Sequence, residues 1–313
     1  MSLRLIENWR GLEGPQRGAS VALGAFDGVH RGHRQVIAEA ARAAAALRAP
    51  LGVISFEPHP SLFFDPKREP FQLTTLAQRA KLLSDLGVDL FYVLRFDAEM
   101  ANLSDEAFVR DVLVGGLGVR HVAAGFDVTF GKGRSGSAEA LAAYGQRFGF
   151  GVSIAQAVVD PSGDKCSSSE IRAHLQGGRP DRAAELLGRP FSIEGVVVHG
   201  DHLGRTLGFP TANVALENYL RPAFGIYAMR TRLGDGREIP GVGYVGRRPT
   251  VNGDDERLEV FLFDFDEDIY GQTLEVDLVA YLRGDEKFDS LDTMVTQINL
   301  DVAAAKAILT PAF

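Results

Sequence analysis

The chain has almost no cysteine and no long apolar run. Cys166 is its single cysteine, so no disulfide can form within the chain, which is typical of proteins from a reducing compartment. No stretch approaches the ~20 consecutive apolar residues that a membrane-spanning helix requires. The N-terminal segment MSLRLIENWR carries charges where a signal peptide has its apolar core. We therefore expect a cytoplasmic protein without a membrane partner.

An excess of basic residues is also absent. The chain has 33 Lys and Arg against 41 Asp and Glu, a formal net charge of −8. Because nucleic-acid-binding proteins generally present a basic face, we expect no nucleic-acid partner, although a local basic pocket for phosphates is compatible with this charge. The expected partners are small-molecule substrates, and the sequence does not indicate an oligomeric state.

Two common nucleotide-binding signatures are missing or misplaced. No GxxxxGK[ST] P-loop occurs in the chain. The pattern GxGxxG occurs at 131–136 and 241–246, but neither match ends a strand and opens a helix. We therefore do not expect a Rossmann dinucleotide site.

The first half of the chain alternates between short apolar segments and amphipathic ones. We predict strands at 20–26, 51–56, 89–96, 120–125 and 152–159, with helices at 34–49, 75–87, 104–116 and 137–149. This order implies βαβ units, that is, a doubly wound parallel sheet of about five strands with helices on both faces. Two short helices, 168–178 and 182–188, follow.

The pattern changes near residue 189, where the helical period gives way to short strands. These lie in 191–200, 225–246 and 257–284, and a final helix is predicted at 290–309. The fold class is therefore α/β: a doubly wound parallel sheet over residues 1–186 is followed by an antiparallel β-barrel with a terminal helix over 187–313.

The segment GAFDGVHRGH, 24–33, follows the first predicted strand and precedes the first helix. Its His30 and His33 have three interpretations: polar turn residues, a zinc pair completed by His59, or groups that act on phosphate. Glycines let backbone amides approach an anion, a helix N-terminus favours negative charge, and imidazoles donate hydrogen bonds to oxygen. We favour the third interpretation, which suits attack on a nucleotide α-phosphate.

The segment CSSSEIR, 166–172, has two interpretations of equal weight. Ser167 with Glu170 can form a capping box, and Gly177 can end the helix, so structure alone would explain these residues. The same arrangement presents hydroxyls and amides to a phosphate, with Arg172 one turn along as a charge clamp.

The segment GRTLGFPTANV, 204–214, places Thr211 and Asn213 on one side of an extended backbone. Their hydroxyl and amide oxygens suit Mg²⁺ held jointly with substrate phosphates. The alternative is an ordinary Gly-Phe-Pro turn that leads into a strand.

The segment RLEVFLFDF, 257–265, alternates strictly. One face carries Leu258, Val260 and Leu262, and the other carries Glu259, Phe261 and Phe263. A carboxylate among phenylalanines is partly desolvated and therefore a better base. The alternative is an edge-strand glutamate that reaches solvent.

Taken in order, these segments resemble the bacterial bifunctional riboflavin kinase/FAD synthetase family. The matching motifs are GAFDGVHRGH, SFEPHP, GFDVTFGKGRSG, SSSEIR, LLGRPFSIEG, GRTLGFPTAN, GRRPTV, LEVFLFDFDEDIYG and EKFDS. The resemblance implies an N-terminal FMN adenylyltransferase, which joins FMN and ATP to give FAD and pyrophosphate. It also implies a C-terminal riboflavin kinase, which transfers the γ-phosphoryl group of ATP to the riboflavin 5′-hydroxyl. Mg²⁺ would accompany ATP in both reactions.

The resemblance also implies roles for residues. His30 and His33 would stabilise the transferring α-phosphate, and Arg172 would neutralise charge. Nucleotide or flavin would be bound by Gly24, Phe26, Asp27, Gly28, Pro58, His59, Asp127, Gly131, Ser168 and Ser169, and GKGRSG would form a mobile loop. In the barrel, Glu259 would be the base, and Thr211 and Asn213 would hold Mg²⁺. Further contacts would come from Gly200, Gly204, Arg205 and Pro210.

Three positions depart from the family pattern. Ser169 stands where Thr is usual, Val128 where an aromatic residue is common, and Tyr244 where Asn is usual. The hydroxyl survives at Ser169, whereas Val128 bears on packing near Asp127 and Tyr244 bears on the affinity for riboflavin.

Three rival functions are compatible with parts of the sequence. Only one half could be active, with the other a flavin-binding module, but the histidine pair, PTAN and Glu259 are all intact. A non-enzymatic flavin carrier would have no need of the histidine pair, Arg172 and Glu259 together. An adenylyltransferase for another substrate, such as pantetheine phosphate, would lack the β domain.

Overall fold

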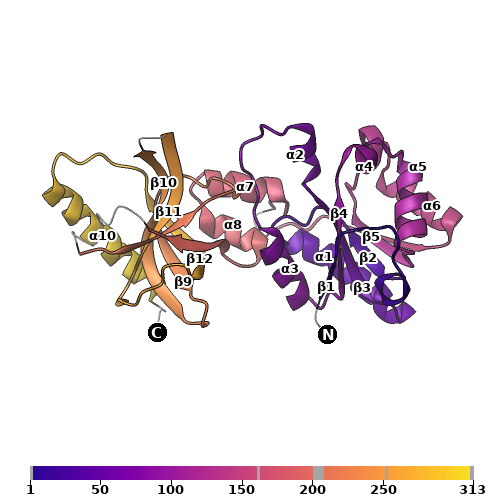
Figure 1. Ribbon diagram of the computed structural model, residues 1–313, viewed down its shortest axis with the longest axis horizontal. Helices are drawn as coiled ribbons and strands as arrows, with labels where there is room; N and C mark the ends of the chain where they lie inside the picture. Colours follow the sequence, from indigo (N-terminus) through magenta and orange to yellow (C-terminus); the bar gives the residue numbers. More distant parts are fainter. Residues whose placement is uncertain (1–2, 161–162, 200–207, 251–252, 311–313) are drawn as a thin grey trace. The chain divides into compact units, whose positions relative to one another are not determined.

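The computed structural model describes residues 3–160, 163–199, 208–250 and 253–310, and side chains outside 248–255. The chain divides into two compact units, each described here by itself (Figure 1). Unit 1 comprises Met1–Glu69 and Leu76–Cys166, and unit 2 comprises Pro70–Thr75 and Ser167–Phe313. Helices α7 (Ser168–Gln176) and α8 (Pro180–Leu187) therefore group with the barrel. Helix α8 contacts the barrel strands β7 and β12, and α7 packs on α8. The functional boundary at 186/187 stays a prediction, because compactness does not define a catalytic module.

Unit 1 contains the expected doubly wound parallel sheet. Within the described residues it has six strands in the order β1-β4-β3-β2-β5-β6. Five correspond to the predicted strands: β2 (Ser20–Leu23), β3 (Leu51–Glu57), β4 (Leu90–Arg95), β5 (His121–Gly125) and β6 (Gly151–Ala155). The sixth, β1 (Arg4–Ile6), was not predicted, because three residues with one buried side chain carry no readable period.

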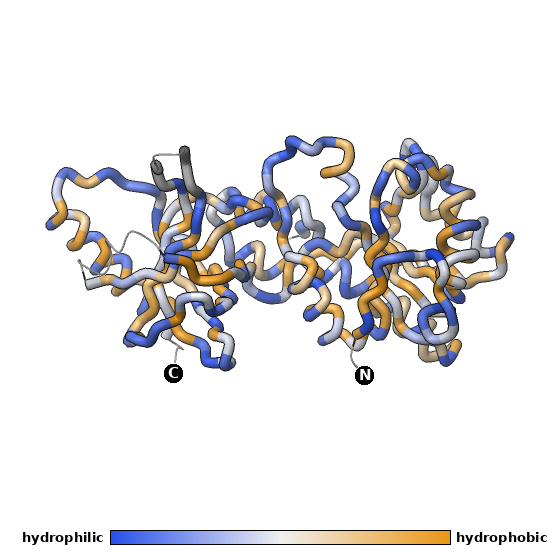
Figure 2. The backbone as a smooth tube through the Cα atoms, in the orientation of Figure 1, coloured by the Kyte–Doolittle hydropathy of each residue, from blue (hydrophilic) through white to orange (hydrophobic). Residues whose placement is uncertain are grey.

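Helices cover both faces of this sheet. On one face, α1 (Arg31–Leu47) and α3 (Leu76–Asp85) pack on alternate strand residues such as Ala22, Val53 and Phe91. The other face packs against η2 (Phe108–Gly116), a π-helix that continues α5 (Asp105–Ala107), and against α6 (Ala138–Phe148). Figure 2 shows the sheet strands as largely hydrophobic and many connecting loops as hydrophilic. The remaining helices of this unit are η1 (Gly14–Gln16), α2 (Pro60–Phe64), α4 (Ala98–Asn102) and η3 (Lys132–Arg134).

The topological switch point of the sheet lies between β2 and β5. From β2 the chain runs outward through β3 and β4, then crosses back to β5 and β6 on the other side of β2. The loops after β2 and β5 therefore diverge and leave a crevice at the carboxyl ends of the strands, where ligands bind in such folds. The segments that begin at Gly24 and Phe126 lie at this edge.

Unit 2 contains the expected antiparallel barrel. Its closed order is β10-β11-β8-β7-β12-β9. The strands are β7 (Phe191–Val198), β8 (Thr211–Ala215), β9 (Gly225–Arg232), β10 (Glu238–Thr250), β11 (Gly253–Leu262) and β12 (Thr273–Arg283). The terminal helix α10 (Leu291–Leu309) packs on the outer face of the barrel, where its Ala305 and Leu309 contact a cluster with Val242 and Phe263.

A buried histidine in unit 1 makes stability depend on pH. Ser20 Oγ donates to the Ala40 carbonyl (2.7 Å), so His121 Nδ1 must donate to Ser20 Oγ (3.1 Å), and Nε2 faces Ser153 Oγ (2.9 Å). The neutral ring thus meets a hydroxyl at each nitrogen. Burial lowers the pKa of His121, and the negative charge of Glu39 opposes this shift.

We expect the free energy of unfolding to fall as the pH decreases from 7 to 5. The folded state holds His121 neutral, whereas the unfolded chain protonates it near pH 6.5, so stability is lost below that value. Urea titrations at several pH values should show a shallower pH dependence for His121→Gln than for the wild type. Equal slopes for the two proteins would contradict this assignment.

Candidate functional site

The loop between β2 and α1 concentrates unfavourable backbone geometry. Phe26, Gly28 and Val29 all have positive φ (52°, 88° and 43°), and Val29 is β-branched and fully buried. Such conformations persist only where the surroundings impose them, and they gather at functional sites. Here Ser55 Oγ (2.8 Å) and Arg79 Nη1 (3.4 Å) both donate to the Ala25 carbonyl and hold the loop.

The loop delivers His30 to the N-terminus of α1. His30 is the N-cap, and its Nδ1 accepts a hydrogen bond from the His33 backbone N–H (3.3 Å). Because Nδ1 is the acceptor, the neutral ring carries its proton on Nε2, which is then a donor. The two imidazole rings stack at 3.6 Å. The backbone N–H groups of Arg31 and Gly32 belong to the first turn, where no intrahelical carbonyl accepts them.

Gly32 is required by the close packing around the histidine pair. A Cβ at this position would lie 2.8 Å from the Cys166 carbonyl oxygen and 3.1 Å from His30 Nδ1. The first distance is too short for any side chain. The glycine between the two histidines therefore allows the first turn of α1 to pack closely against the backbone at Cys166.

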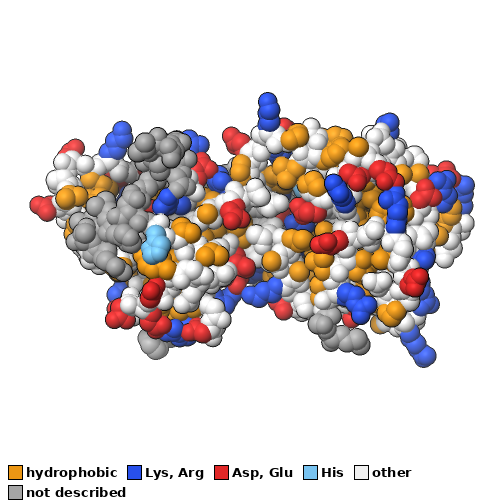
Figure 3. Space-filling view, viewed as in Figure 1, with side chains coloured by type: hydrophobic (Ala, Val, Ile, Leu, Met, Phe, Trp, Pro, Cys, Tyr) orange, Lys and Arg blue, Asp and Glu red, His pale blue; other side chains and the backbone are white. Residues whose placement is uncertain are grey.

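Unit 1 also contains a pocket of about 730 Å³ at this edge of the sheet. Five phenylalanines are among its lining residues, and on the face drawn in Figure 3 hydrophobic side chains gather over α2. Gly24, His59 and Gly131 are the predicted residues that line it. The sequence did not indicate the aromatic part of the lining, although Phe56 and Phe96 are the last residues of two predicted strands. The phenylalanines that line the pocket are Phe56, Phe64, Phe96, Phe108 and Phe130.

Pro58 and His59 connect β3 to this pocket. The Glu57–Pro58 peptide bond is cis, and His59 is the N-cap of α2, with its Nδ1 accepting from the Ser61 N–H (3.2 Å). Among the residues that the structure describes, no group of three or more His, Cys, Asp or Glu side chains could hold a metal. The zinc interpretation of His30, His33 and His59 therefore has no structural support.

The loop GKGRSG, 131–136, forms another wall of the pocket. Asp105 Oδ1 accepts from Ser135 Oγ (2.9 Å), and Asp105 Oδ2 accepts from Tyr144 (2.9 Å). These bonds lower the pKa of Asp105 and keep it an acceptor. A Cβ on Gly131 would lie 2.5 Å from the Asp105 nitrogen, so glycine is needed here. The predicted mobility of this loop stays a prediction.

Asp127 lies just after β5 and has a partner that sequence reasoning missed. Lys165 Nζ donates to Asp127 Oδ2 (2.6 Å) and lies 4.8 Å from the centre of the Phe126 ring. Two residues 38 positions apart, separated in the chain by α6 and β6, thus form a cation–carboxylate pair near the carboxyl edge of the sheet. Val128, next in the chain, lines the pocket and packs on the core.

In unit 2, helix α7 begins as predicted. Ser167 caps it by accepting from the Glu170 N–H (3.2 Å), and Gly177 is its C-cap. Ser168 and Ser169 occupy its first turn. Arg172 Nε donates to the Phe71 carbonyl (2.8 Å), and its guanidinium lies 5.0 Å from the centre of the Phe71 ring. Phe71 belongs to the short segment 70–75, which is distant from Arg172 in the chain. The sequence therefore could not indicate the contact between these two residues.

The barrel places the predicted kinase residues in one row. Tyr244 on β10 pairs with Glu259 on β11, and Glu259 pairs with Asn213 on β8. Asn213 in turn pairs with Val198 on β7, and Phe261 lies opposite Thr211. The predicted alternation is confirmed, since Leu258, Val260 and Leu262 are buried whereas Glu259 is half-buried on the outer face.

Asn213 is buried and held at both ends of its amide. Arg257 Nη1 donates to Asn213 Oδ1 (3.1 Å), and Asn213 Nδ2 lies 3.4 Å from the Thr211 carbonyl oxygen. Arg257 was not predicted, but its position two residues before Glu259 places it on the same face. Amide and hydroxyl oxygens are ligands that Mg²⁺ accepts, and Oδ1 keeps a second lone pair beside its bond from Arg257. The donor set therefore fits the metal.

The predicted contacts that precede β8 are described only in part. Gly200, Gly204 and Arg205 lie outside the described residues. Pro210 is exposed, and the preceding Phe209 packs edge to face on Phe261 with ring centres 5.4 Å apart. On the β7 side of the row, Val196 and Val198 are about half exposed (49% and 46%), and His199 stacks on Tyr270 at 3.9 Å.

Two family models match successive parts of the chain. The family model described as FAD synthetase matches residues 13–170, and that described as riboflavin kinase matches residues 187–309. A bifunctional riboflavin kinase/FMN adenylyltransferase from Pseudomonas fluorescens is 41% identical to this chain, and the alignment covers 99% of each protein. A protein of the same description from Escherichia coli (strain K12) is 39% identical, with 97% of each chain covered.

A solved structure is similar over almost the whole chain. It is a Streptococcus pneumoniae protein described as a macrolide-efflux protein, with a TM-score of 0.85 and 33% identity, covering 96% of this chain and 97% of its own. The transport activity in that description is said of that protein only. In the part of this chain that the structure describes, no helix has the length and apolar character to cross a membrane.

Proposed function

The chain belongs to the family of bifunctional riboflavin kinases/FMN adenylyltransferases, and from this premise we propose how its residues divide the two reactions. The enzyme phosphorylates riboflavin with ATP to give FMN, and it transfers AMP from ATP to FMN to give FAD and pyrophosphate. One observation supports the division: the histidine pair lies in unit 1, whereas Glu259, Thr211 and Asn213 lie in unit 2. The histidine pair and the proposed kinase residues thus lie in different units, whereas Ser168, Ser169 and Arg172, which we assign to adenylyl transfer from the family pattern, group with unit 2.

In adenylyl transfer, we assign charge stabilisation to the start of α1. A phosphate oxygen of FMN attacks the α-phosphorus of ATP, and the bond from that phosphorus to the pyrophosphate oxygen breaks. Negative charge on the α-phosphate oxygens meets His30 Nε2–H, the His33 ring and the first-turn N–H groups of α1. Because the His33 N–H donates to His30 Nδ1, the proton of the neutral ring is on Nε2, which is the proposed donor.

The aromatic pocket of unit 1 is the proposed flavin site. Its volume of about 730 Å³ is within the range of small-molecule pockets, ~300–1,000 Å³. Phenylalanine rings suit a flat aromatic ligand such as the flavin ring system. Gly24 and the strained loop through Phe26, Asp27 and Gly28 lead from this pocket to His30, so a flavin phosphate can extend toward α1. His59 and Gly131 line this pocket, and Pro58, which precedes His59, is proposed as a further contact from the family pattern.

The remaining nucleotide contacts of the first reaction are proposed from the family pattern and local chemistry. Asp127 would orient ligand donors with Lys165 beside it. Ser168 and Ser169 would donate from the first turn of α7, and Arg172 would neutralise phosphate charge. The bond from Arg172 Nε to Phe71 fixes the orientation of its guanidinium.

In riboflavin phosphorylation, Glu259 is the proposed base. Its carboxylate accepts the proton of the riboflavin 5′-hydroxyl as that oxygen attacks the γ-phosphorus of ATP. Thr211 and Asn213 would hold Mg²⁺, which when bound neutralises charge on the ATP phosphates. Arg257 orients the Asn213 amide through Oδ1. Gly200, Gly204, Arg205 and Pro210 are proposed contacts of the nucleotide.

The order of the row predicts the direction of each substrate. Asn213 lies between Glu259 and the exposed Val198. Phosphates held at Asn213 therefore place the nucleoside of ATP toward Val196 and Val198, and riboflavin toward Glu259 and β10. Apolar valines suit a nucleobase, which is flat and poorly hydrated on its faces.

The environment of the enzyme follows from its surface and composition. Figure 3 shows basic and acidic side chains interspersed, with no continuous basic face on the side drawn. We propose small-molecule substrates without a nucleic-acid partner. The single Cys166, which is buried, supports a cytoplasmic location.

Chromatography of flavins tests the proposed function directly. The purified chain is incubated with riboflavin, ATP and Mg²⁺, and samples are taken over time. We expect FMN to appear first and FAD to follow, because FMN is the substrate of the second reaction. FMN alone would contradict the assignment of unit 1, and bound but unchanged riboflavin would support a flavin carrier instead.

A further inference from the structure

Tyr244 stands beside the proposed base of the kinase reaction. Its position on β10 is paired with Glu259 on β11, on the opposite side of Glu259 from Asn213. The ring lies over Gly246, where a Cβ would come within 2.0 Å of the Tyr244 hydroxyl oxygen. Glycine at this position is thus what allows the ring to lie along the outer face of the barrel.

The hydroxyl of Tyr244 reaches a segment distant in sequence. It donates to Asp285 Oδ2 (3.2 Å), two residues beyond the end of β12. Burial raises the pKa of Tyr244 to about 12, and the bond to Asp285 and the negative charge of Glu259 add to this shift. The hydroxyl therefore keeps its proton, and remains a donor, at neutral pH.

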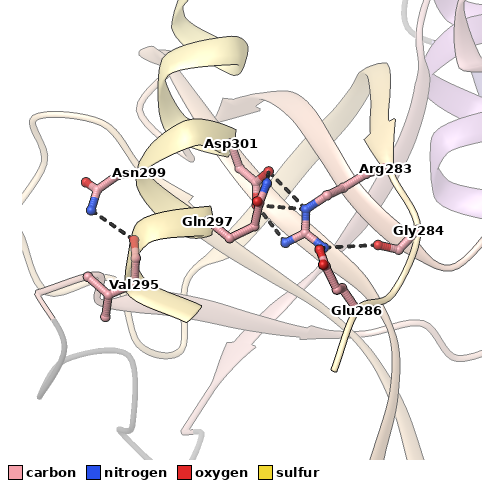
Figure 4. Close-up of polar contacts among 7 residues, drawn as sticks. All are labelled: Arg283, Gly284, Glu286, Val295, Gln297, Asn299 and Asp301. Atoms are coloured by element: carbon pink, nitrogen blue, oxygen red, sulfur yellow. Dashed lines mark hydrogen bonds and ion pairs between the residues drawn. The ribbon is translucent and has the colours of Figure 1, made fainter. Parts of the chain in front are cut away.

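The segment that carries Asp285 is anchored at its start by Arg283 (Figure 4). Arg283 Nη2 (2.8 Å) and Nε (3.0 Å) donate to the Asp301 carboxylate on α10, to which Gln297 also donates (3.0 Å). Its Nη1 donates to the Gly284 carbonyl (3.1 Å). The guanidinium also lies 3.7 Å from Glu286 and 5.7 Å from the centre of the Phe288 ring.

A second contact to this segment comes from the barrel, at Asp285. Arg283 holds the backbone at Gly284 and the side chains of Glu286 and Phe288, which alternate along the chain. Asp285, between Gly284 and Glu286, accepts a hydrogen bond from Tyr244. A chain of contacts thus connects α10 through Arg283 and Asp285 to the residue paired with Glu259.

We propose that Tyr244 is a positioning residue for riboflavin in the kinase site, acting through Asp285. By holding Asp285, it fixes the segment 284–288 beside Glu259 before riboflavin binds, and this inference rests on the proposed role of Glu259 as the base. Tyr244 and Asn213 flank Glu259 on opposite sides. With the metal and the ATP phosphates at Asn213, as proposed above, the Tyr244 side is the side of the flavin. A segment that is already ordered costs less free energy when the substrate binds.

The expected effect is on KM rather than on kcat. In Tyr244→Phe the ring stays over Gly246 and the bond to Asp285 is lost, so the KM for riboflavin should rise about fivefold, with kcat for FMN formation within about twofold of wild type. Asp285→Ala should give the same increase, and the double variant no further increase. Asp285→Asn, which retains an acceptor oxygen, should restore a KM close to that of the wild type.

Three controls separate this inference from its premise. Tyr281→Phe also removes a tyrosine hydroxyl from the barrel, where it donates to the Phe224 carbonyl (3.1 Å), and should leave the riboflavin KM unchanged. FAD formation from supplied FMN should be the same in all variants, because it belongs to unit 1. Glu259→Gln tests the premise: full kinase activity in that variant would remove the proposed base and this inference with it.

If Glu259→Gln is inactive as a kinase, the riboflavin KM values of the Tyr244 and Asp285 variants test the inference. An unchanged riboflavin KM in Tyr244→Phe and Asp285→Ala would overturn the inference. Additive increases in the double variant would also overturn it, since the two residues would then act separately. A loss of kcat and thermal stability at constant KM would show a structural role only and would likewise overturn it.

Discussion

Replacing His30 with alanine is expected to reduce FAD formation by at least about a hundredfold, while FMN formation stays within about twofold of wild type. His30 Nδ1 accepts from the His33 N–H, so the proton of the neutral ring is on Nε2, the donor that we assign to the α-phosphate. Alanine removes that donor where charge develops. The measurement is FAD production from FMN and ATP, with FMN production from riboflavin as the internal comparison.

The His30 variant needs a control because this residue also caps α1. Loss of an N-cap costs about 1 kcal/mol of stability, which could affect unit 1 independently of chemistry. His30→Ser retains an oxygen that can cap the helix but has no donor at the position of Nε2. We expect His30→Ser to fold like the wild type and still to lose FAD formation. A wild-type rate in His30→Ser would show that the imidazole acts only as a cap.

Replacing Glu259 with glutamine is expected to have the opposite result. FMN formation should fall by at least about a hundredfold, because an amide cannot accept the proton of the riboflavin hydroxyl. FAD formation from supplied FMN should be unchanged. The substitution preserves size, and Glu259 lies half-buried on the outer face, so the barrel should remain folded. The measurement is FMN production from riboflavin, ATP and Mg²⁺.

Glu256 offers a matched control on the same strand. It is a carboxylate on the other face of β11, where it accepts from Arg221 (2.7 Å) and Arg247 (2.9 Å). Glu256→Gln should therefore lower stability through these two bonds but leave FMN formation within a few-fold of wild type. If both activities fell together in Glu259→Gln or in His30→Ala, the assignment of one reaction to each unit would be wrong.

The aromatic pocket shows why some of the site was not readable in the chain. Gly24, His59 and Gly131 belong to segments with turn residues and histidines, which local sequence patterns indicate. Phe96 and Phe108 come from ordinary apolar stretches, where a phenylalanine in a pocket wall and one in a core look alike. Only the divergence of loops at the switch point between β2 and β5 decides which of them face a cavity.

Contacts between distant segments were equally inaccessible. The Arg172–Phe71, Lys165–Asp127 and Tyr244–Asp285 pairs each join residues more than thirty positions apart. Arg257 differs, because its position on the face of Glu259 follows from the period of two in β11. Its bond to Asn213 still depends on the pairing register between β8 and β11.

The sequence by itself determined what depends on local geometry. The alternation of apolar and amphipathic segments determined the parallel sheet, and strict alternation in 257–263 determined the face of Glu259. The place of the histidine pair near a helix start followed from the apolar strand before it and the amphipathic helix after it, although α1 begins at Arg31 and not at the predicted residue 34. The tertiary structure alone decided strand register, the pocket, the tautomer of His30 and the placement of Tyr244 beside Glu259. These depend on which distant backbones come together, and that is a property of the packed fold, because no short stretch of residues encodes it.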